Sequence, residues 1–504
     1  METSNKYTEI LGRNIDAINL VVNAVKGTLG PKGLDVMLVD KFGNFKCTND
    51  GVEILSNMEL NHPVMKLIIQ SAKSQELKVG DGTTTVVVLC GAILNQALKK
   101  IDNGFQVIRL IEGLKLGIEL ATQELRSMSK PIKSTKDKPL ADLVHISARG
   151  DKTISQLIIK AASQIENQNK SMDLLVKNDS GFDFSDTVSG ILNADSLILD
   201  GMFVRKKTHF NYSKFFKDTD ILVIEGPFEP EPMSSEAVST DEGVKKYEQN
   251  IQLLLETAKR ISKAGIKAVF CSSSMMPVVE EFFVKEEIFV LTHLKNSDIN
   301  RLVNISGAKL CTRSKLFNID ALSILSYAGK LEKITKYDEL GGLCFSGKKN
   351  YQPSLLIGAE TESVLEEKKL IAIDACKALI AGLRSGFVVG EGVAELNISA
   401  SLASQVDNLN LEKDIRAGFE IITQALKAPF EQILINAGFQ ASDAIKNLKL
   451  SPENLTGIDL DTGNPIDLAQ TGVLDATEAK ISALKISSEL AVQILRINSI
   501  IQAK

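Results

Sequence analysis

The chain of 504 residues contains no tryptophan, only 5% aromatic residues and only four histidines. Its six cysteines are scattered along the chain without a close pair; they are Cys47, Cys90, Cys271, Cys311, Cys344 and Cys376. Zinc ribbons and small disulfide frameworks both need closely spaced cysteines, so neither is expected. The histidines are equally dispersed, and no metal centre or catalytic triad is visible among them. We expect most of the cysteines to be buried as small apolar residues.

The chain also lacks a long basic run, and its apolar runs are far shorter than the roughly 20 residues that cross a bilayer. Its formal net charge of −5 disfavours a general nucleic-acid-binding protein. The first residues have no apolar signal region. With 44% hydrophobic and 24% charged residues, the composition is that of an ordinary core-forming protein, long enough for several domains. These features predict a cytoplasmic protein that binds neither nucleic acid nor membrane.

The most informative stretch, residues 80–85, reads Gly-Asp-Gly-Thr-Thr-Thr and opens into the apolar run 86–89. Glycines let the backbone turn tightly and approach a ligand, because they lack a Cβ. The first turn of a helix has unpaired N–H donors and the positive end of the dipole, which together suit a phosphate. Asp81 would repel a phosphate unless a divalent cation such as Mg²⁺ lies between them. The alternative is a simple turn with threonine as a helix cap.

Hydrophobic periodicity predicts helices toward both ends of the chain. Helical spacing of apolar residues predicts a helix that ends at Gly27, and Gly43-Asn44 predicts a hairpin within residues 34–48. Long helices are expected from residue 83 to about 100, from about 106 to 128, and over most of 394–504.

From residue 172 the pattern changes to short β-rich runs separated by turns. Strands are expected at residues 174–176, 196–199, 221–224, 268–271 and 288–291. The last two, with a helix between them, predict βα units and a parallel sheet. The strands fade around 341–357, and 366–383 is again helical. This order predicts a helical domain made of both chain ends and interrupted by an inserted α/β domain.

A proline-rich stretch within the α/β region cannot be helix or central strand. Residues 226–232 contain three prolines and are followed by a Ser/Glu-rich segment up to Gly243. We expect an exposed excursion, followed by a helix over about 247–261. Phe228, Met233 and Val238 are apolar residues in this polar segment. They predict either an interaction surface or small local packing.

Other loops share the glycine-rich, polar character of residues 80–85. They are residues 28–33, Asp50-Gly51, Gly390-Glu391-Gly392 and Gly472-Val473-Leu474-Asp475. None of them is a P-loop, because the Gly-x-x-x-x-Gly-Lys-Ser/Thr pattern is missing. Asp374 lies on the flank of an apolar helical stripe. Taken alone, it would be interpreted as a solvated or salt-bridged carboxylate.

Together these residues resemble the chaperonin family over essentially the whole chain, in the family's order and spacing. The matching stretches are residues 29–33, 48–52 and 80–85, Asp374, Gly390-x-Gly392 and Gly472-x-x-Asp475. The resemblance implies an ATP hydrolase whose subunits form a stacked double ring, enclose non-native client proteins and couple Mg-ATP hydrolysis to folding.

The resemblance also implies three domains, two of them built from two chain segments. The equatorial domain would comprise residues 1–137 and 387–504, the intermediate domain 138–193 and 342–386, and the apical domain 194–341. The equatorial domain would be helical and the other two α/β. The apical domain would carry a helical protrusion over about 226–263.

Site residues can be transferred only onto the positions that match the family. The phosphates would be held by Thr28, Leu29, Gly30, Pro31, Thr83, Thr84 and Thr85, and Mg²⁺ by Asp81. Asp50 and Asp374 would orient or activate the attacking water, and Asp475 would reach the ribose. Gly51, Gly82, Gly390 and Gly392 would bring the backbone to ATP, and Lys152 would sense the γ-phosphate. Phosphoryl transfer needs mainly positioning and charge balance, which these residue types provide.

The protrusion and the absence of a Gly-Gly-Met-rich tail resemble group II chaperonins, which have a built-in lid and need no separate co-chaperonin. Archaeal, eukaryotic cytosolic and bacterial (group III) branches stay open. The short spacing of 16 residues from Asp374 to Gly390 favours the bacterial branch.

Glu391 stands where the family usually has a glycine, and it would weaken ATP binding if its Cβ pointed at the adenosine. A ring subunit with weak or no ATPase activity is therefore one alternative. An ATP-dependent enzyme acting on a small molecule is another. The α/β region shows no His/Cys cluster or nucleophile elbow that would favour the enzyme.

Overall fold

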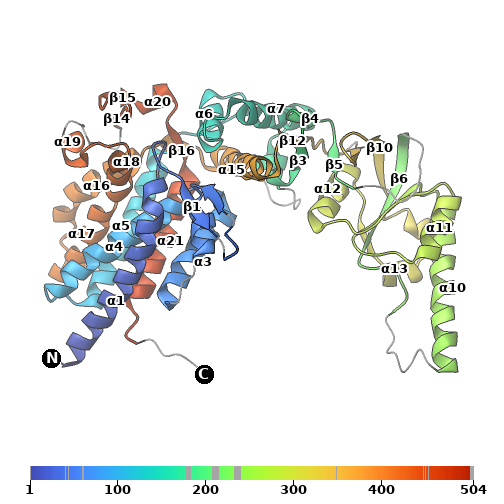
Figure 1. Cartoon of the computed structure of the whole chain (residues 1–504), viewed down its shortest axis with the longest axis horizontal. Helices are drawn as coiled ribbons and strands as arrows, with labels where there is room; N and C mark the ends of the chain where they lie inside the picture. The colour runs from blue at the N-terminus through green and yellow to red at the C-terminus, as the bar shows by residue number, and fades with distance from the viewer. Residues whose placement is uncertain are drawn as a thin grey trace. The chain divides into compact units, whose positions relative to one another are not determined.

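The computed structural model describes residues 2–39, 41–43, 45–58, 62–176, 183–206, 215–231, 240–347, 349–446, 448, 450–451 and 453–499 (Figure 1). The chain forms two compact units. The first comprises Met1–Ser155 and Asp374–Lys504, and the second is the intervening stretch Gln156–Ile373. The first unit therefore contains both ends of the chain.

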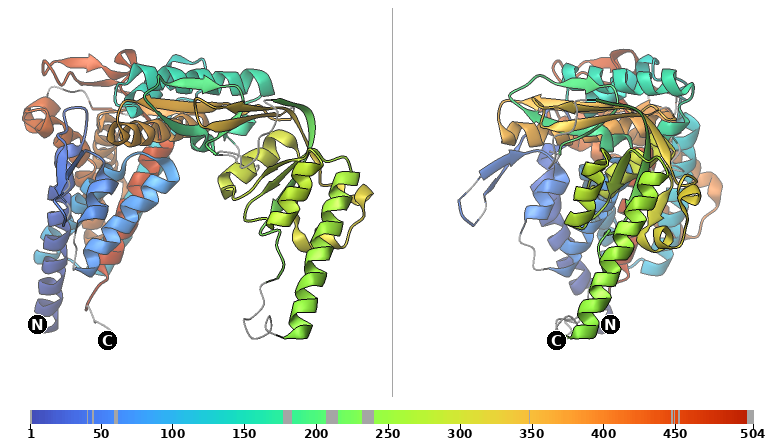
Figure 2. Two further views of the ribbon diagram at one scale, coloured as in Figure 1. Left: turned by 45° about the vertical axis from the view of Figure 1, so that its right-hand side comes forward. Right: turned by 90° about the vertical axis from the view of Figure 1, so that its right-hand side faces the viewer.

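Long helices make up the first unit and run side by side as a bundle (Figures 1 and 2). They are α1 (Glu2–Val25), α3 (Pro63–Val79), α4 (Thr83–Asp102), α5 (Val107–Met128), α17 (Lys413–Ala425) and α21 (Thr477–Leu495). Helix α4 packs against α1, α3, α17 and α21. Burying most of its apolar side chains makes α4 the centre of the core.

Shorter elements surround this bundle. The helices are η1 (Lys26–Thr28), α2 (Gly51–Asn57), α6 (Lys138–Ser147), α16 (Val393–Gln405), η4 (Val406–Leu409), α18 (Ala428–Asn436), α19 (Ala441–Lys446) and α20 (Leu468–Thr471). The strands pair antiparallel: β1 (Val36–Val39) with β2 (Phe45–Thr48), β13 (Phe387–Val389) with β16 (Leu474–Ala476), and β14 (Thr456–Ile458) with β15 (Pro465–Asp467). The hairpin predicted within residues 34–48 is therefore present.

Helix α4 is also the one described helix that is long and apolar enough to span a membrane by length and composition. In its most apolar window, 61% is buried inside the protein. Its position in the middle of the bundle explains this composition, because a helix that is apolar all round needs neighbours on every side.

The second unit is built on a mixed sheet in the order β5–β11–β10–β6–β7–β8, with β9 beside β6. Its strands are β5 (Met202–Val204), β6 (Phe215–Glu225), β7 (Ala268–Cys271), β8 (Phe289–Leu291), β9 (Leu310–Thr312), β10 (Gly329–Tyr337) and β11 (Gly342–Gly347). Strands β6 to β9 pair parallel, as the βα pattern predicts. Helix α12 (Asn296–Ser306) packs on one face, and α10 (Asp241–Lys263) and α11 (Pro277–Lys285) pack on the other.

A smaller sheet in the order β3–β12–β4 completes the second unit. Its strands are β3 (Val188–Leu192), β4 (Leu197–Leu199) and β12 (Ser354–Ala359). The remaining helices are α8 (Asp173–Val176), η3 (Phe184–Thr187), α13 (Arg313–Phe317) and α14 (Ala321–Ile324). Two further helices, α7 (Lys152–Asn169) and α15 (Glu362–Ser385), run from one unit into the other.

The predicted order of helical ends around an α/β insert is confirmed, but two local predictions are wrong. Residues 174–176 belong to the short helix α8, because a three-residue apolar run does not distinguish helix from strand. The strands do not fade around 341–357, since β11 and β12 lie there. Every residue of β12 is buried, so it lacks the alternation that marks a half-exposed strand.

The proline-rich excursion is only partly described. Phe228 is fully buried and pairs through its backbone with Met275, so local packing is the correct interpretation for this residue. Met233 and Val238 lie outside the described residues, as do residues 500–504. Helix α10, which begins after the N-cap Thr240, supplies the predicted helix.

The contact between α5 and α17 joins the two ends of the chain and depends on glycine. A Cβ added at Gly113 would overlap the backbone carbonyl oxygen of Ile415, and one at Gly418 would overlap that of Leu110. These helices therefore approach more closely than any side chain allows.

We expect Gly113→Ala to destabilise the protein by about 1–3 kcal/mol or more, because the backbone must move to remove the overlap. The matched control is Gly12→Ala in α1, where an added Cβ has nothing within 4 Å. That change should leave the melting temperature unchanged or slightly raised, since alanine favours helix. Thermal unfolding followed by circular dichroism checks both variants. Equal melting temperatures for the two would contradict the packing described.

Candidate functional site

The loop at residues 80–85 is held by two glycines in the left-handed conformation. Gly80 ends α3 with φ 75°, and Gly82 is the N-cap of α4 with φ 79°. No side chain caps α4, and its first turn contains no acidic residue. The first N–H groups of this 20-residue helix therefore have no side-chain acceptor, which favours an anion there.

Glycine also lets separate elements meet at this loop. A Cβ added at Gly51, the first residue of α2, would lie 2.7 Å from Oγ1 of Thr84. One added at Gly80 would overlap the side chain of Lys377 on α15. The amide of Gln75 on α3 donates to the carbonyl of Asp81 over 2.7 Å. The structure thus brings α2, α3 and α15 to the N-terminus of α4.

Asp50 is the N-cap of α2 and is half-buried. Its carboxylate accepts a hydrogen bond from the N–H of Val52 over 2.8 Å. Burial and the nearby charge of Glu76 raise the pKa of Asp50, and the backbone donors and Arg149 oppose this. The side chain of Asp50 is therefore held in a fixed orientation close to another carboxylate, that of Glu76.

Asp374 lies in the same acidic region. Burial and the charge of Glu76 raise its pKa to about 9; Asp50 contributes in the same direction, and Lys377 opposes the shift. The charge of Glu76 thus disfavours the ionised form of Asp374. The amine of Lys377 lies 3.2 Å from Oε1 of Glu76. Three carboxyl groups, from Asp50, Glu76 and Asp374, thus lie close to only two cations.

Asp81 accepts a hydrogen bond from the N–H of Gly82 over 2.6 Å. The residue is exposed to solvent. Desolvation by neighbouring protein atoms and the charge of Asp475 raise its pKa, and Gly82 and Lys480 act against the shift. Because Asp81 is exposed, solvent screens these charges and reduces the shift.

Mg²⁺ would bind at Asp81 only if a bound nucleotide supplied further oxygen ligands. Among the described residues, no group of three or more His, Cys, Asp or Glu side chains could hold a metal ion. Mg²⁺ commonly takes one or two protein carboxylates and completes its shell with phosphate oxygens and water. A single exposed carboxylate beside a helix N-terminus suits that arrangement.

Asp475 lies beside the Gly390–Gly392 turn, because β13 pairs with β16. A Cβ added at Gly390 would lie 3.3 Å from Oδ2 of Asp475. Gly392 is the left-handed N-cap of α16, and an added Cβ would lie 2.6 Å from the backbone nitrogen of Phe430. The structure therefore requires glycine at 392, while at 390 an added side chain would be tightly packed against Asp475.

Glu391, between these glycines, has a left-handed backbone with φ 59°. Its carboxylate accepts a hydrogen bond from the N–H of Ile458 over 3.3 Å. Burial raises its pKa to about 7, and the Ile458 donor opposes the shift. The side chain is thus engaged with the β14–β15 hairpin.

The loop at residues 28–33 is anchored by its own hydrogen bonds and by α18. The Thr28 hydroxyl donates to the carbonyl of Val25, and the Asn436 amide donates to the carbonyls of Lys26 and Leu29, each over 2.8 Å. Gly30 has φ 85°. Because η1 contacts α4, this loop lies against the same helix as residues 80–85.

Lys152 is exposed at the start of α7, which Asp151 caps. Within the part of the chain that the structure describes, no hydrogen bond or ion pair joins Lys152 to another predicted site residue. The nearby Arg149, in a left-handed conformation with φ 52°, acts electrostatically on Asp50. Arg149 is therefore a better-placed cation in this conformation.

Sequence reasoning missed several residues that the structure adds to the site. They are Gln75, Glu76, Arg149, Lys377, Glu395 and Lys480. One signal was available for Lys377, because it lies three residues after Asp374 on a helix and so faces the same side. The others could not be recognised without the tertiary contacts.

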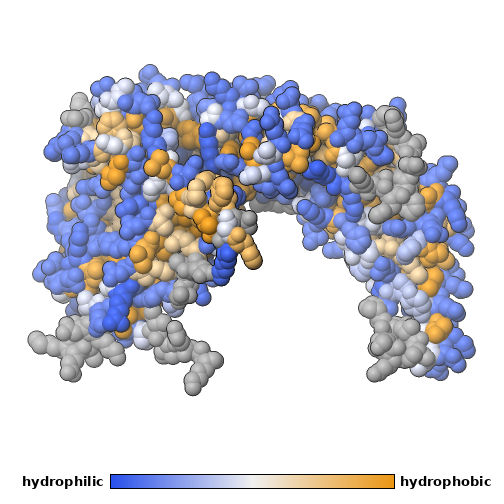
Figure 3. All heavy atoms as spheres, in the orientation of Figure 1, coloured by the Kyte–Doolittle hydropathy of each residue, from blue (hydrophilic) through white to orange (hydrophobic). Residues whose placement is uncertain are grey.

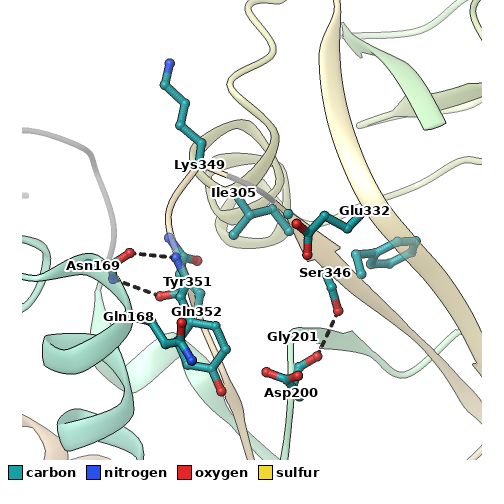
Figure 4. A pocket seen from close by; sticks show the side chains of 12 residues that line it. Gln168, Asn169, Asp200, Gly201, Ile305, Glu332, Ser346, Lys349, Tyr351 and Gln352 are labelled. Carbon is teal, nitrogen blue, oxygen red and sulfur yellow. Dashed lines mark hydrogen bonds between the residues drawn. The ribbon is translucent and has the colours of Figure 1, made fainter. Parts of the chain in front are cut away.

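A pocket of about 290 Å³ lies elsewhere, in the second unit (Figure 4). Asp200, Glu332, Ser346 and Gln352 are among its lining residues. Asn169, at its edge, forms two hydrogen bonds with the backbone of Tyr351. The pocket contains none of the predicted site residues, and its chemistry does not resemble a phosphate site.

Comparison with known proteins places the chain among the chaperonins. Residues 21–504 match the TCP-1/cpn60 chaperonin family. The chain is 29% identical to the thermosome subunit beta of Archaeoglobus fulgidus and 28% identical to the thermosome subunit alpha of Thermoplasma acidophilum; each match covers 97% of this chain and 91% of the relative.

A crystal structure of a group III chaperonin in the open state superposes with a TM-score of 0.83 at 30% identity, covering 98% of this chain and 99% of that one. The predicted resemblance to thermosome-type chaperonins is thus confirmed. The chain belongs to the TCP-1/cpn60 chaperonin family.

Proposed function

We propose that this chaperonin subunit binds Mg-ATP at the N-terminus of α4, hydrolyses it, and couples turnover to the folding of client proteins within a stacked ring in the cytoplasm. The binding and hydrolysis of Mg-ATP are supported by one observation. An uncapped helix N-terminus lies beside a cluster of carboxyl groups drawn from three other elements. A phosphate and a divalent cation together would satisfy both features.

The residues fit this ligand in distinct roles. The N–H groups of Thr83, Thr84 and Thr85 would bind phosphate oxygens, and residues 28–31 would hold them from the side of η1. Asp81 would hold Mg²⁺, which when bound offsets the charge that develops on the phosphates. Asp475 would bind the ribose. Lys152 keeps its proposed contact with the γ-phosphate, which needs a different placement of its side chain.

The attacking water would lie between Asp50 and Asp374. Asp50, fixed by the backbone of α2, would orient the water, and Asp374 would accept its proton. With its pKa raised to about 9, Asp374 holds a proton near neutral pH in the absence of ligand. The cation of Mg-ATP, when bound nearby, would favour the ionised form of Asp374 and so prepare it to act as the base.

We expect Asp374→Asn to lower the steady-state ATPase rate by about 10²–10⁴-fold, because the amide cannot accept the proton. Binding of Mg-ATP should stay close to that of the wild type. Asp102→Asn, the same change at the exposed far end of α4, is the control and should keep full activity. Normal turnover by Asp374→Asn would refute the assigned role.

The same variant offers a check on folding. The pKa of Asp374 is raised in the native state, so the native state keeps a proton that the unfolded chain loses. The contribution of Asp374 to the free energy of unfolding therefore falls as the pH rises from about 4 to about 9. Asparagine does not ionise and so avoids this loss of stability. Asp374→Asn should therefore be at least as thermostable as the wild type at pH 8.

Asp81→Ala should weaken Mg-ATP binding itself by about tenfold or more, because it removes the metal carboxylate. Binding of ATP without Mg²⁺ should fall less or even rise, since a negative charge beside the phosphates is lost. Isothermal titration with and without Mg²⁺ measures the difference. An unchanged Mg²⁺ dependence would place the metal elsewhere.

Ring assembly is supported by the β1–β2 hairpin of the first unit. Met37, Val39, Phe42 and Phe45 on this hairpin are 61–91% exposed. Apolar residues gather at this position in Figure 3. A two-stranded sheet also has unpaired edges and is marginally stable alone. We propose that a second copy of the chain covers this hairpin in the ring.

We expect Met37→Ser combined with Phe45→Ser to shift the protein from rings toward single subunits, as seen by electron microscopy and analytical ultracentrifugation. Leu322→Ser, at a leucine that is 78% exposed in the second unit, is the control. It should leave the rings intact. Rings of unchanged stability in the hairpin variant would argue for a different interface.

Client binding and lid closure are proposed for the second unit. Val244 and Tyr247 on α10 are partly exposed, as are Leu322 and Leu325 at α14, which packs against α10. Exposed apolar side chains of this kind would suit the binding of non-native proteins. Helix α10 would form part of the built-in protrusion, so that no separate lid is needed. Rings that assemble without ATP turnover would instead favour the weak-ATPase alternative.

A further inference from the structure

A buried ion cluster next to the proposed nucleotide site joins Asp475 to two residues, Lys480 and Glu395, that have no role in the function outlined above. The amine of Lys480, in the first turn of α21, lies 2.8 Å from Oδ2 of Asp475 and 2.9 Å from Oε1 of Glu395. The side chains of Lys480, Asp475 and Glu395 are 11%, 21% and 4% exposed. They come from three elements, α21, β16 and α16, so the cluster ties these elements together.

The charges in this cluster are unequal, because two carboxylates share one amine. Burial lowers the pKa of Lys480, but Asp475 and Glu395 together raise it, so the amine stays charged. The second oxygen of Glu395, Oε2, is buried and has no hydrogen-bond partner among the described residues. The two acids therefore depend on Lys480 as their common counterion.

The cluster also borders the turn that contains Gly390 and Gly392. Oδ2 of Asp475 lies beside Gly390, whose N–H donates to the carbonyl of Val473 over 2.9 Å. Glu395 lies in the first turn of α16, which begins directly after Gly392. Through Asp475, Lys480 contacts β16, which pairs with the strand before the turn (β13). Through Glu395 it contacts α16, the helix that follows the turn.

We propose that Lys480 is a positioning residue that holds the carboxylate of Asp475 in place beside this turn, so that Asp475 accepts hydrogen bonds from the ribose hydroxyls of the nucleotide. Glu395 fixes the amine from the other side. The chemical group recognised is the vicinal diol of a ribonucleotide. This inference rests on the proposed function and adds a residue that neither the glycine pattern nor the family motifs contain.

A purely structural role would predict something different. Removing Lys480 leaves two buried carboxylates without a counterion, which destabilises any protein. Neutralising Glu395 as well restores the cluster's net charge of one negative unit. If Lys480 served only charge balance, the double variant Lys480→Met/Glu395→Gln would recover both folding and nucleotide recognition. If Lys480 positions Asp475, folding recovers and recognition of the ribose does not.

The experiment compares Mg-ATP with its 2′,3′-dideoxy analogue by equilibrium binding to the assembled protein. The wild type should prefer ATP by roughly tenfold or more, since hydrogen bonds to a charged acceptor are lost in the analogue. Asp475→Asn should lose most of this preference, because the charged acceptor itself is removed. Lys480→Met and the double variant should also lose a large part of it, while both keep similar affinity for the dideoxy analogue. Lys480→Arg keeps the charge and should retain part of the preference.

The outcomes are distinguishable. A double variant that folds and prefers ATP as strongly as the wild type overturns the positioning role. A wild type that binds Mg-ATP without any preference over the analogue also overturns it, together with the assignment of the ribose to Asp475, but leaves the proposed ATP hydrolysis intact. Failure of the wild type to bind Mg-ATP at all would refute the proposed function itself. If Lys480→Met alone does not fold, the double variant supplies the same comparison.

Discussion

The constraint on which the rest of the first unit depends is the crowding of carboxyl groups at the N-terminus of α4. Asp50, Glu76 and Asp374 come from three elements, and the charge of Glu76 raises the pKa of both Asp50 and Asp374. Such repulsion costs stability unless a proton or a cation relieves it. The bundle must therefore hold these groups in place against their own charge, and the buried helix α4, packed on several sides, provides the rigid frame for doing so.

Close backbone approach is how the frame brings distant parts of the chain together. Gly113 and Gly418 let α5 and α17 meet, which joins the two chain ends. Gly51 lets α2 meet Thr84 at the head of α4. Folding of the bundle and formation of the site are thus the same event. A protein that failed to pack its two ends would have neither Asp374 nor Asp475 near the loop at residues 80–85.

Local patterns made part of this site predictable from the sequence. The glycines at 80, 82 and 392 are typical of tight turns, and all three have a left-handed backbone. An apolar run after three threonines indicates the start of a buried helix. Glu76, Arg149 and Lys480 were not predictable, because ordinary charged residues acquire a role only through tertiary neighbours. Strand β12 was missed for a related reason. It is buried throughout, and its apolar run carries no alternation.

The two acidic clusters of the first unit, around Asp374 and around Asp475, differ in how their negative charge is balanced. At Asp374 the acids outnumber their cations, and burial and the charge of Glu76 raise its pKa to about 9. At Asp475 a buried amine lies 2.8 Å from the carboxylate and forms an ion pair with it. Enzymes commonly place two carboxyl groups in different environments that suit different roles. A raised pKa suits Asp374 as a group that must accept a proton during hydrolysis. A close ion pair suits Asp475 as a group that only recognises its ligand, because the pair holds the carboxylate in one position.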